Sequence, residues 1–92
     1  MDLSGFPGGQ MIEKGLADLA GGGETEESLL VLIGAPRLQR LGFDVPDDVH
    51  QVSPEHRLYA LLSRDDSDSA HARYNALIRR LVSFERAMEC AR

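Results

Sequence analysis

The 92-residue chain has no tryptophan and one cysteine, Cys90. A single cysteine cannot form a disulfide within the chain, so we expect a cytoplasmic protein. The longest uninterrupted apolar run, Leu29 to Ile33, is far shorter than the ~20 residues needed to cross a bilayer. The first residues also lack the basic and apolar regions of a secretory signal. We therefore expect no membrane association.

Basic residues are scarce relative to acidic ones, ten against fifteen, which gives a net charge of −5. This balance fits poorly with a dedicated nucleic-acid-binding protein, which usually has a basic surface. The charge is unevenly spread, because residues 1–55 carry ten acidic and three basic side chains, whereas residues 56–92 carry five and seven. The split predicts complementary surfaces within the chain or between two copies. A basic face remains an alternative for the C-terminal third.

Apolar residues recur at helical spacing from Gly9 onward. Ile12, Leu16 and Leu19 share one helical face, and the glycines of residues 21–23 end that helix. Residues 1–8 show little apolar periodicity. We therefore expect a flexible N-terminal arm over residues 1–8 and a single helical domain over residues 9–92.

The run from Leu29 to Ile33 fits either a buried strand or a buried helix. We favour a helix because Thr25 is a good N-cap and Glu26 and Glu27 complement the helix dipole. No second strand is apparent to pair with it. Its apolar character on most sides predicts the central helix of the core. Pro36 then suits the start of a short helix that ends before Gly42.

The second half of the chain predicts a connector and two further helices. Residues 43–52 read as an extended connector anchored by Phe43, Val45 and Val49. Ser53 and Pro54 are a strong helix start. A polar turn then precedes a last helix that ends near Cys90 and is capped by Asp66, Ser67 or Ser69. The predicted fold is all-α, a compact bundle of four to five short helices with a longer C-terminal helix.

The last helix has an unusually wide apolar face, about half its circumference at ~100° per residue. Such a face suits burial among several helices or a seam between two copies, and both interpretations stand. The residues that we assign to a candidate interface are Tyr74, Leu77, Leu81, Phe84, Glu85 and Met88.

Glu85 is the exception on this face, because a carboxylate buried there needs a donor or a proton. Arg57, His56 or an arginine of a second copy are candidate partners. The interpretation we favour is that the last turns extend beyond the core, which leaves Glu85 exposed to water.

Arg64 and His71 are separated by six residues. The pair resembles the Arg-x(4–6)-His signature of HEPN ribonucleases, a helical and dimeric family. The resemblance implies that Arg64 stabilises phosphate charge and that His71 transfers a proton. The spacer departs from the family, since its three aspartates repel phosphate and Asp65 replaces the usual polar residue. The alternative is a turn with a surface arginine and a first-turn histidine.

Other patterns lack the residues that their chemistry needs. Asp68 and His71 are too few for a metal site, and His50 and His56 add no ligand spacing. The glycine runs contain no phosphate-binding motif, and Cys90 has no paired histidine. Residues 27–43 resemble a helix-turn-helix, but the second helix is too short for a major groove. We predict no catalytic, cofactor-binding or metal-binding residues and no cofactor.

Taken together, the sequence predicts a non-enzymatic helical protein-interaction module, either self-associating or an accessory or regulatory subunit. Its expected partner is a second copy, giving a homodimer, or another protein. The alternative is a small regulatory nucleic-acid-binding protein, and a HEPN-like ribonuclease ranks behind both.

Overall fold

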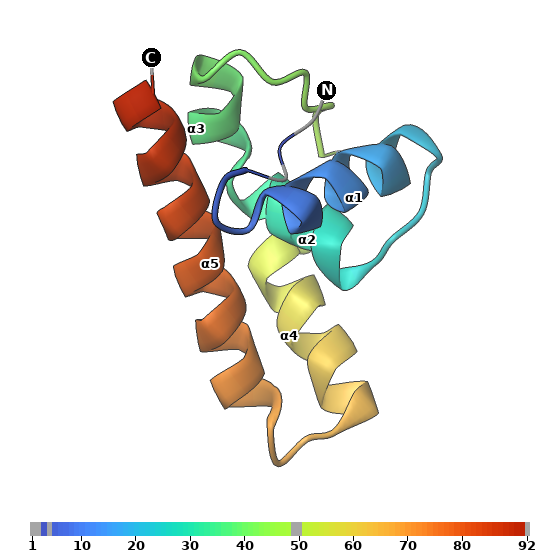
Figure 1. Cartoon of the computed structure of the whole chain (residues 1–92). Helices are drawn as coiled ribbons and strands as arrows, with labels where there is room; N and C mark the ends of the chain where they lie inside the picture. The colour runs from blue at the N-terminus through green and yellow to red at the C-terminus, as the bar shows by residue number, and fades with distance from the viewer. Residues whose placement is uncertain (1–2, 4, 49–50, 92) are drawn as a thin grey trace.

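The computed structural model describes residues 3, 5–48 and 51–91, and over these residues the chain forms five α-helices and no strand (Figure 1). The prediction of an all-α fold with a long C-terminal helix is confirmed. The helices are α1 (Gly9–Ala20), α2 (Glu26–Ile33), α3 (Ala35–Arg40), α4 (Pro54–Asp65) and α5 (Ala70–Ala91). No helix in these ranges is long and apolar enough to cross a membrane.

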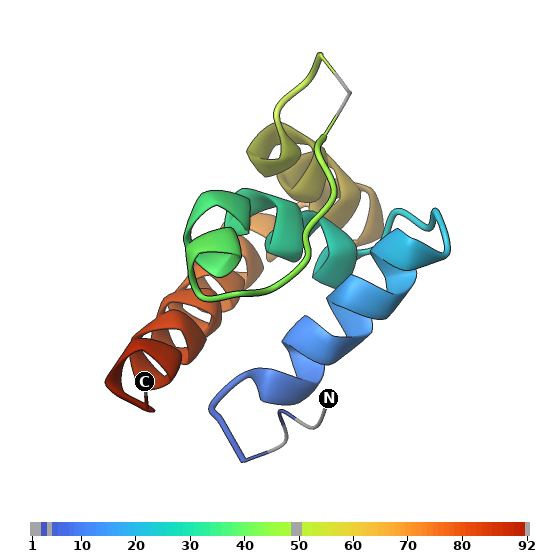
Figure 2. The same cartoon turned by 90° about the horizontal axis from the view of Figure 1, so that it is seen from above.

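Helix α2 is the centre of the molecule, because it contacts each of the other four helices. Figure 2 shows it between α1 and α5. Its residues Leu29, Leu30 and Val31 are almost completely buried. Helices α4 and α5 pack side by side and run in opposite directions across the tight turn that joins them (Figure 1). The predicted role of residues 26–33 as the central helix is confirmed.

The starts of α2 and α4 are stabilised by hydrogen bonds to the side chains that the sequence predicts as N-caps. At α2, the Ser28 amide donates to Thr25 Oγ1 (3.1 Å) and the Thr25 amide donates to Ser28 Oγ (2.7 Å), which forms a capping box. At α4, the His56 amide donates to Ser53 Oγ (3.3 Å). The capping box at α2 gives the first amides of that helix hydrogen-bond partners, which favours a helix for its apolar run.

Helices α1 and α2 approach each other closely at Gly15. A Cβ atom at this position would lie 2.4 Å from the carbonyl oxygen of Glu27 and 2.5 Å from Val31 Cγ2. Real side chains do not tolerate these distances, so the α1–α2 contact depends on a glycine within a helix, where glycine is otherwise unfavourable.

The described residues of the N-terminal segment pack on the core. Leu3 is buried, and its amide donates to the carboxylate of Glu13. The Phe6 ring meets the Phe84 ring edge-on, with centroids 6.2 Å apart. Two apolar side chains in so short a segment form no periodic pattern, so the sequence does not predict this contact.

The segment after α3 crosses the core in extended form. Phe43 and Val45 are buried as predicted, and Gln39 Nε2 donates to the Val45 carbonyl (2.9 Å). Val49, the third predicted anchor, lies outside the described residues. Before α5, the Asp68 amide donates to Asp66 Oδ1 (3.1 Å) within the turn, and Ser69 directly precedes the helix.

Candidate interaction surfaces

Two of the six predicted interface residues belong to the core of the single chain. Phe84 is fully buried, and its ring lies 6.2 Å from that of Phe6 and 5.8 Å from that of Phe43. Leu81 is buried beside it on α5. Because other parts of the same chain cover both side chains, a partner surface on α5 has to be formed by their neighbours.

The other apolar members of the set lie at the margins of the core. Tyr74, Leu77 and Met88 are half-buried and pack against the core cluster. Ile78 and Val82 are half-buried as well. The wide apolar face therefore divides into a covered centre and a partly open edge.

Glu85 is buried, with 4% of its surface exposed, so the favoured expectation of an exposed side chain is wrong. Its partner is also not one of those proposed from the sequence. Arg37 of α3 places Nη1 3.4 Å from Glu85 Oε1 and also binds Glu89 through two nitrogens. Glu85 is covered because Gly34 lies beside its carboxylate and Arg37 reaches it from α3. Arg57 and His56, the candidates from the sequence, lie on α4 instead.

The surroundings of Glu85 affect its protonation. Burial raises the pKa of Glu85, and the nearby Arg37 guanidinium opposes that shift. The hydrogen bond from Arg37 has the reverse effect on Glu89, whose pKa is lowered.

Gly34 leaves space for the buried carboxylate, because a Cβ there would lie 3.0 Å from both Glu85 Oε2 and Leu81 Cδ1. Gly34 was not singled out from the sequence, because its role depends on a residue of α5 far along the chain.

A surface notch between α4 and α5 contains an aromatic pair. The rings of Tyr59 and Tyr74 have centroids 5.8 Å apart and are tilted by 59°. Together with Glu55 and His56 they line a concavity of about 270 Å³. Tyr59 is 40% exposed. Burial raises the pKa of Tyr74, and the charge of Glu55 adds to the effect.

Tyr59 was not singled out from the sequence. Its helix has an apolar stripe formed by Leu58, Leu61 and Leu62. The available signal was an aromatic residue beside that stripe, on the polar side of a helix, where a large ring has no place in the core. We call the concavity lined by Glu55, His56, Tyr59 and Tyr74 the tyrosine notch.

A second concavity, of about 330 Å³, lies between α2 and the connector that leads to α4. Arg57 lies at its edge, with Nε 2.8 Å from Glu24 Oε1 and Nη1 2.8 Å from Asp48 Oδ2. Its Nη1 also donates to the carbonyl of Val52 (3.2 Å). Arg57 is thus occupied in joining three segments of the chain, which suits a structural role.

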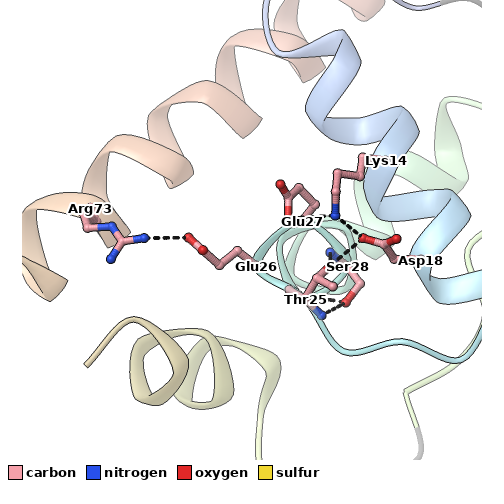
Figure 3. A network of polar contacts seen from close by, with 7 residues as sticks. All are labelled: Lys14, Asp18, Thr25, Glu26, Glu27, Ser28 and Arg73. Atoms are coloured by element: carbon pink, nitrogen blue, oxygen red, sulfur yellow. Dashed lines mark hydrogen bonds and ion pairs between the residues drawn. The ribbon is translucent and has the colours of Figure 1, made fainter. Parts of the chain in front are cut away.

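Further ion pairs surround the start of α2 (Figure 3). Lys14 and Asp18 on α1 pair at 2.7 Å, and Asp18 also accepts from the Thr25 hydroxyl (2.7 Å). On the other side, Arg73 of α5 reaches Glu26 at 3.2 Å. These contacts connect α1 and α5 to the amino end of α2, where acidic side chains also complement the helix dipole.

The residues of the HEPN resemblance lie on either side of the α4–α5 turn. Arg64 is in the last turn of α4 and lines a concavity with Leu61 and Ala60, whereas His71 is not among the residues lining it. His71 Nε2 lies 3.2 Å from Asn75 Nδ2 of its own helix. Arg64 and His71 thus face different neighbours.

The remaining candidate motifs can be placed as well. Within the described ranges, no three histidine, cysteine, aspartate or glutamate side chains cluster as metal ligands, and His50 lies outside those ranges. Helix α3, the second helix of the helix-turn-helix resemblance, has six residues. Its Arg37 is engaged by Glu85 and Glu89, and Leu38 is buried.

Comparison of the chain with protein-family models, with curated proteins and with solved structures gives no match.

Proposed function

We propose that the chain is a non-enzymatic protein-interaction module that pairs with a second copy of itself through the α4–α5 face. The observation that carries the proposal is Tyr59, a large ring 40% exposed at the surface and tilted against Tyr74. Tyrosine is enriched in protein interfaces, because its ring gains free energy from burial while its hydroxyl tolerates water in the unbound state.

The notch continues into an apolar row on α5. Tyr74, Ile78 and Val82 follow one another at four-residue spacing and are all half-buried. Residues at this spacing form a ridge on a helix, the element by which helices pack. The next residue in the row is Arg86, which is exposed. The row is therefore apolar with a charged end, as in an interface with an apolar centre and a polar rim.

A second copy is the partner that this face suits. Glu55 lies near one end of the row and Arg86 lies at the other, so the two ends carry opposite charges. A two-fold axis through the middle of the row would bring each acidic end onto a basic end. An accessory subunit of another protein is the second form of the proposal. A cytoplasmic location belongs with both, since Cys90 is exposed and unpaired.

Light scattering on a gel-filtration column over a range of protein concentrations tests the proposal. We expect a dimer that Val82→Gln weakens by about tenfold or more. Val52→Gln is the matched control, because Val52 is 55% exposed and belongs to neither α4 nor α5. A monomer at every concentration would overturn self-association, and equal weakening by both variants would overturn the choice of face.

The alternative of nucleic-acid binding is favoured by one observation. Arg79, Arg80 and Arg86 are exposed on α5 and make no ion pair within the described part of the chain. A labelled RNA or DNA oligonucleotide distinguishes the two functions. Binding that weakens steeply between low and moderate salt would support nucleic-acid binding, and its absence would support the protein-interaction proposal.

A further inference from the structure

We infer that the tyrosine notch is a binding site for a guanidinium group, and that Arg86 of a second copy fills it. The occupant rests on the proposed self-association, whereas the site rests on the chemistry of the notch itself. The argument concerns the two rings, the Glu55 carboxylate and the position of Arg86.

The two tyrosine rings form a corner that suits a cation. Their centroids are 5.8 Å apart and their planes are tilted by 59°, so they do not lie flat on each other. A cation is attracted to the face of an aromatic ring within about 6 Å of its centroid. A group seated in the notch lies close to both rings, and the 40% exposure of Tyr59 leaves its ring accessible.

Glu55 supplies a negative charge beside this corner. It makes no hydrogen bond or ion pair with any residue in the described ranges, whereas Glu24, Glu26 and Glu89 are each paired with an arginine. Its charge reaches Tyr74, since it contributes to the raised pKa of that phenol. The notch thus combines two aromatic rings and His56 with a carboxylate that forms no ion pair within the described part of the chain.

The open form of the notch favours guanidinium over ammonium. An ammonium group is strongly hydrated and gains little at a solvent-exposed site. A guanidinium group is planar and more weakly hydrated, so it stacks on a ring while its N–H groups donate to a carboxylate. A single carboxylate at the edge of two rings matches this pattern.

Arg86 is placed to reach the notch of a second copy. It lies twelve positions after Tyr74, about 18 Å along α5 at ~1.5 Å per residue. It is exposed and makes no hydrogen bond or ion pair with a described residue. A two-fold axis near the midpoint between Tyr74 and Arg86 would place each Arg86 at the other copy's notch.

Tyrosine fluorescence gives a direct measurement, because the chain has two tyrosines and no tryptophan. The probe is N-acetyl-arginine amide, with N-acetyl-citrulline amide as its neutral counterpart, at constant ionic strength. The experiment uses Arg86→Gln at a protein concentration below the dissociation constant of its weakened dimer, where we expect a folded monomer. We expect a saturable change with the arginine probe and none with the citrulline probe. Tyr59→Phe should retain the response, and Tyr59→Leu should lose it.

Charge variants identify the source of the guanidinium. We expect Glu55→Gln to abolish probe binding and to weaken the dimer about tenfold, the loss expected of Arg86→Gln as well. Asp44→Asn is the control for removal of one exposed negative charge elsewhere, and it should change neither. Circular dichroism confirms that each variant is folded.

Each contrary result would overturn a different part of the proposal. Equal responses to arginine and citrulline would overturn the guanidinium site, whatever the oligomeric state. A selective arginine response together with an Arg86→Gln dimer as strong as the wild type would overturn Arg86 as the occupant. A monomeric wild-type protein would overturn the proposed self-association and Arg86 as the occupant, while the probe would still decide whether the notch binds guanidinium.

Discussion

The carboxylate of Glu85 on α5 lies 3.4 Å from the guanidinium of Arg37 on α3, which joins residues 48 positions apart in the chain. Arg37 also binds Glu89, one turn further along α5. Helix α3 has only six residues, and a helix of that length is unstable without tertiary contacts. The buried Glu85, the more exposed Glu89 and the shared arginine are among the contacts that hold it against α5.

We expect Glu85→Gln to gain stability relative to the wild type as pH rises from about 4 to about 7. Burial raises the pKa of Glu85 despite Arg37, so the folded state holds this proton more tightly than the unfolded state. The contribution of Glu85 to the free energy of unfolding therefore falls as the pH rises from the ordinary pKa of glutamate through the raised pKa of Glu85. Urea midpoints at the two pH values measure the effect.

Glu89→Gln is the control, because its expected pH dependence has the opposite sign. The hydrogen bond from Arg37 lowers the pKa of Glu89, so its stabilising contribution is present at neutral pH and is lost as pH falls through the lowered value. The variant should lose stability at neutral pH and approach the wild type in acid. The same sign of pH dependence in both variants would contradict the arrangement around Arg37.

We expect Gly15→Ala to destabilise the protein by about 1–3 kcal/mol. The added Cβ would meet the Glu27 carbonyl and Val31, which lie on the facing helix. This strain exceeds the gain of up to ~1 kcal/mol that alanine brings to a helix. Chemical denaturation measures the difference.

Gly21→Ala is the same substitution at a position without the close contact. Gly21 has φ of −85°, and a Cβ there would lie 3.6 Å or more from its neighbours. We expect no loss, or a gain of about 0.5–1 kcal/mol from the stiffer unfolded chain. Stabilisation by both substitutions would mean that α1 and α2 lie further apart than described.

We expect Phe84→Ala to cost about 3–5 kcal/mol, a large share of the ~5–15 kcal/mol typical of a folded domain. Phe84 is fully buried between Phe6 and Phe43, so its loss leaves a cavity within the chain. Urea denaturation followed by circular dichroism should show this loss, with a smaller loss for Phe6→Ala, which is half-buried. A folded monomer with little loss of stability after Phe84→Ala would instead place Phe84 in a seam between copies.

The helix starts and ends could be predicted because each depends on residues that are adjacent in the chain. Thr25 and Ser53 cap the helices that directly follow them, and the glycines of residues 21–23 follow the end of α1. The burial of α2 could also be predicted from the sequence, because five apolar residues in succession leave a short helix no polar face.

The candidate sites were harder to predict, because they depend on contacts between distant segments. Periodicity identified the apolar face of α5 but could not say that Phe6 and Phe43 cover Phe84. It also gave no sign that Tyr59 would meet Tyr74 across the α4–α5 turn. Such pairings are set by how helices dock, and a one-dimensional pattern of apolar residues is compatible with several dockings.

The sequence by itself determined the all-α class, the order of the helices and the central place of α2, since short-range hydrogen bonding and helical periodicity decide these features. Only the tertiary structure decided that Glu85 is buried with Arg37, that Gly15 and Gly34 admit close neighbours, and that a tyrosine notch opens between α4 and α5. The physical reason is that burial, ion pairing and steric fit depend on which distant side chains share the same space.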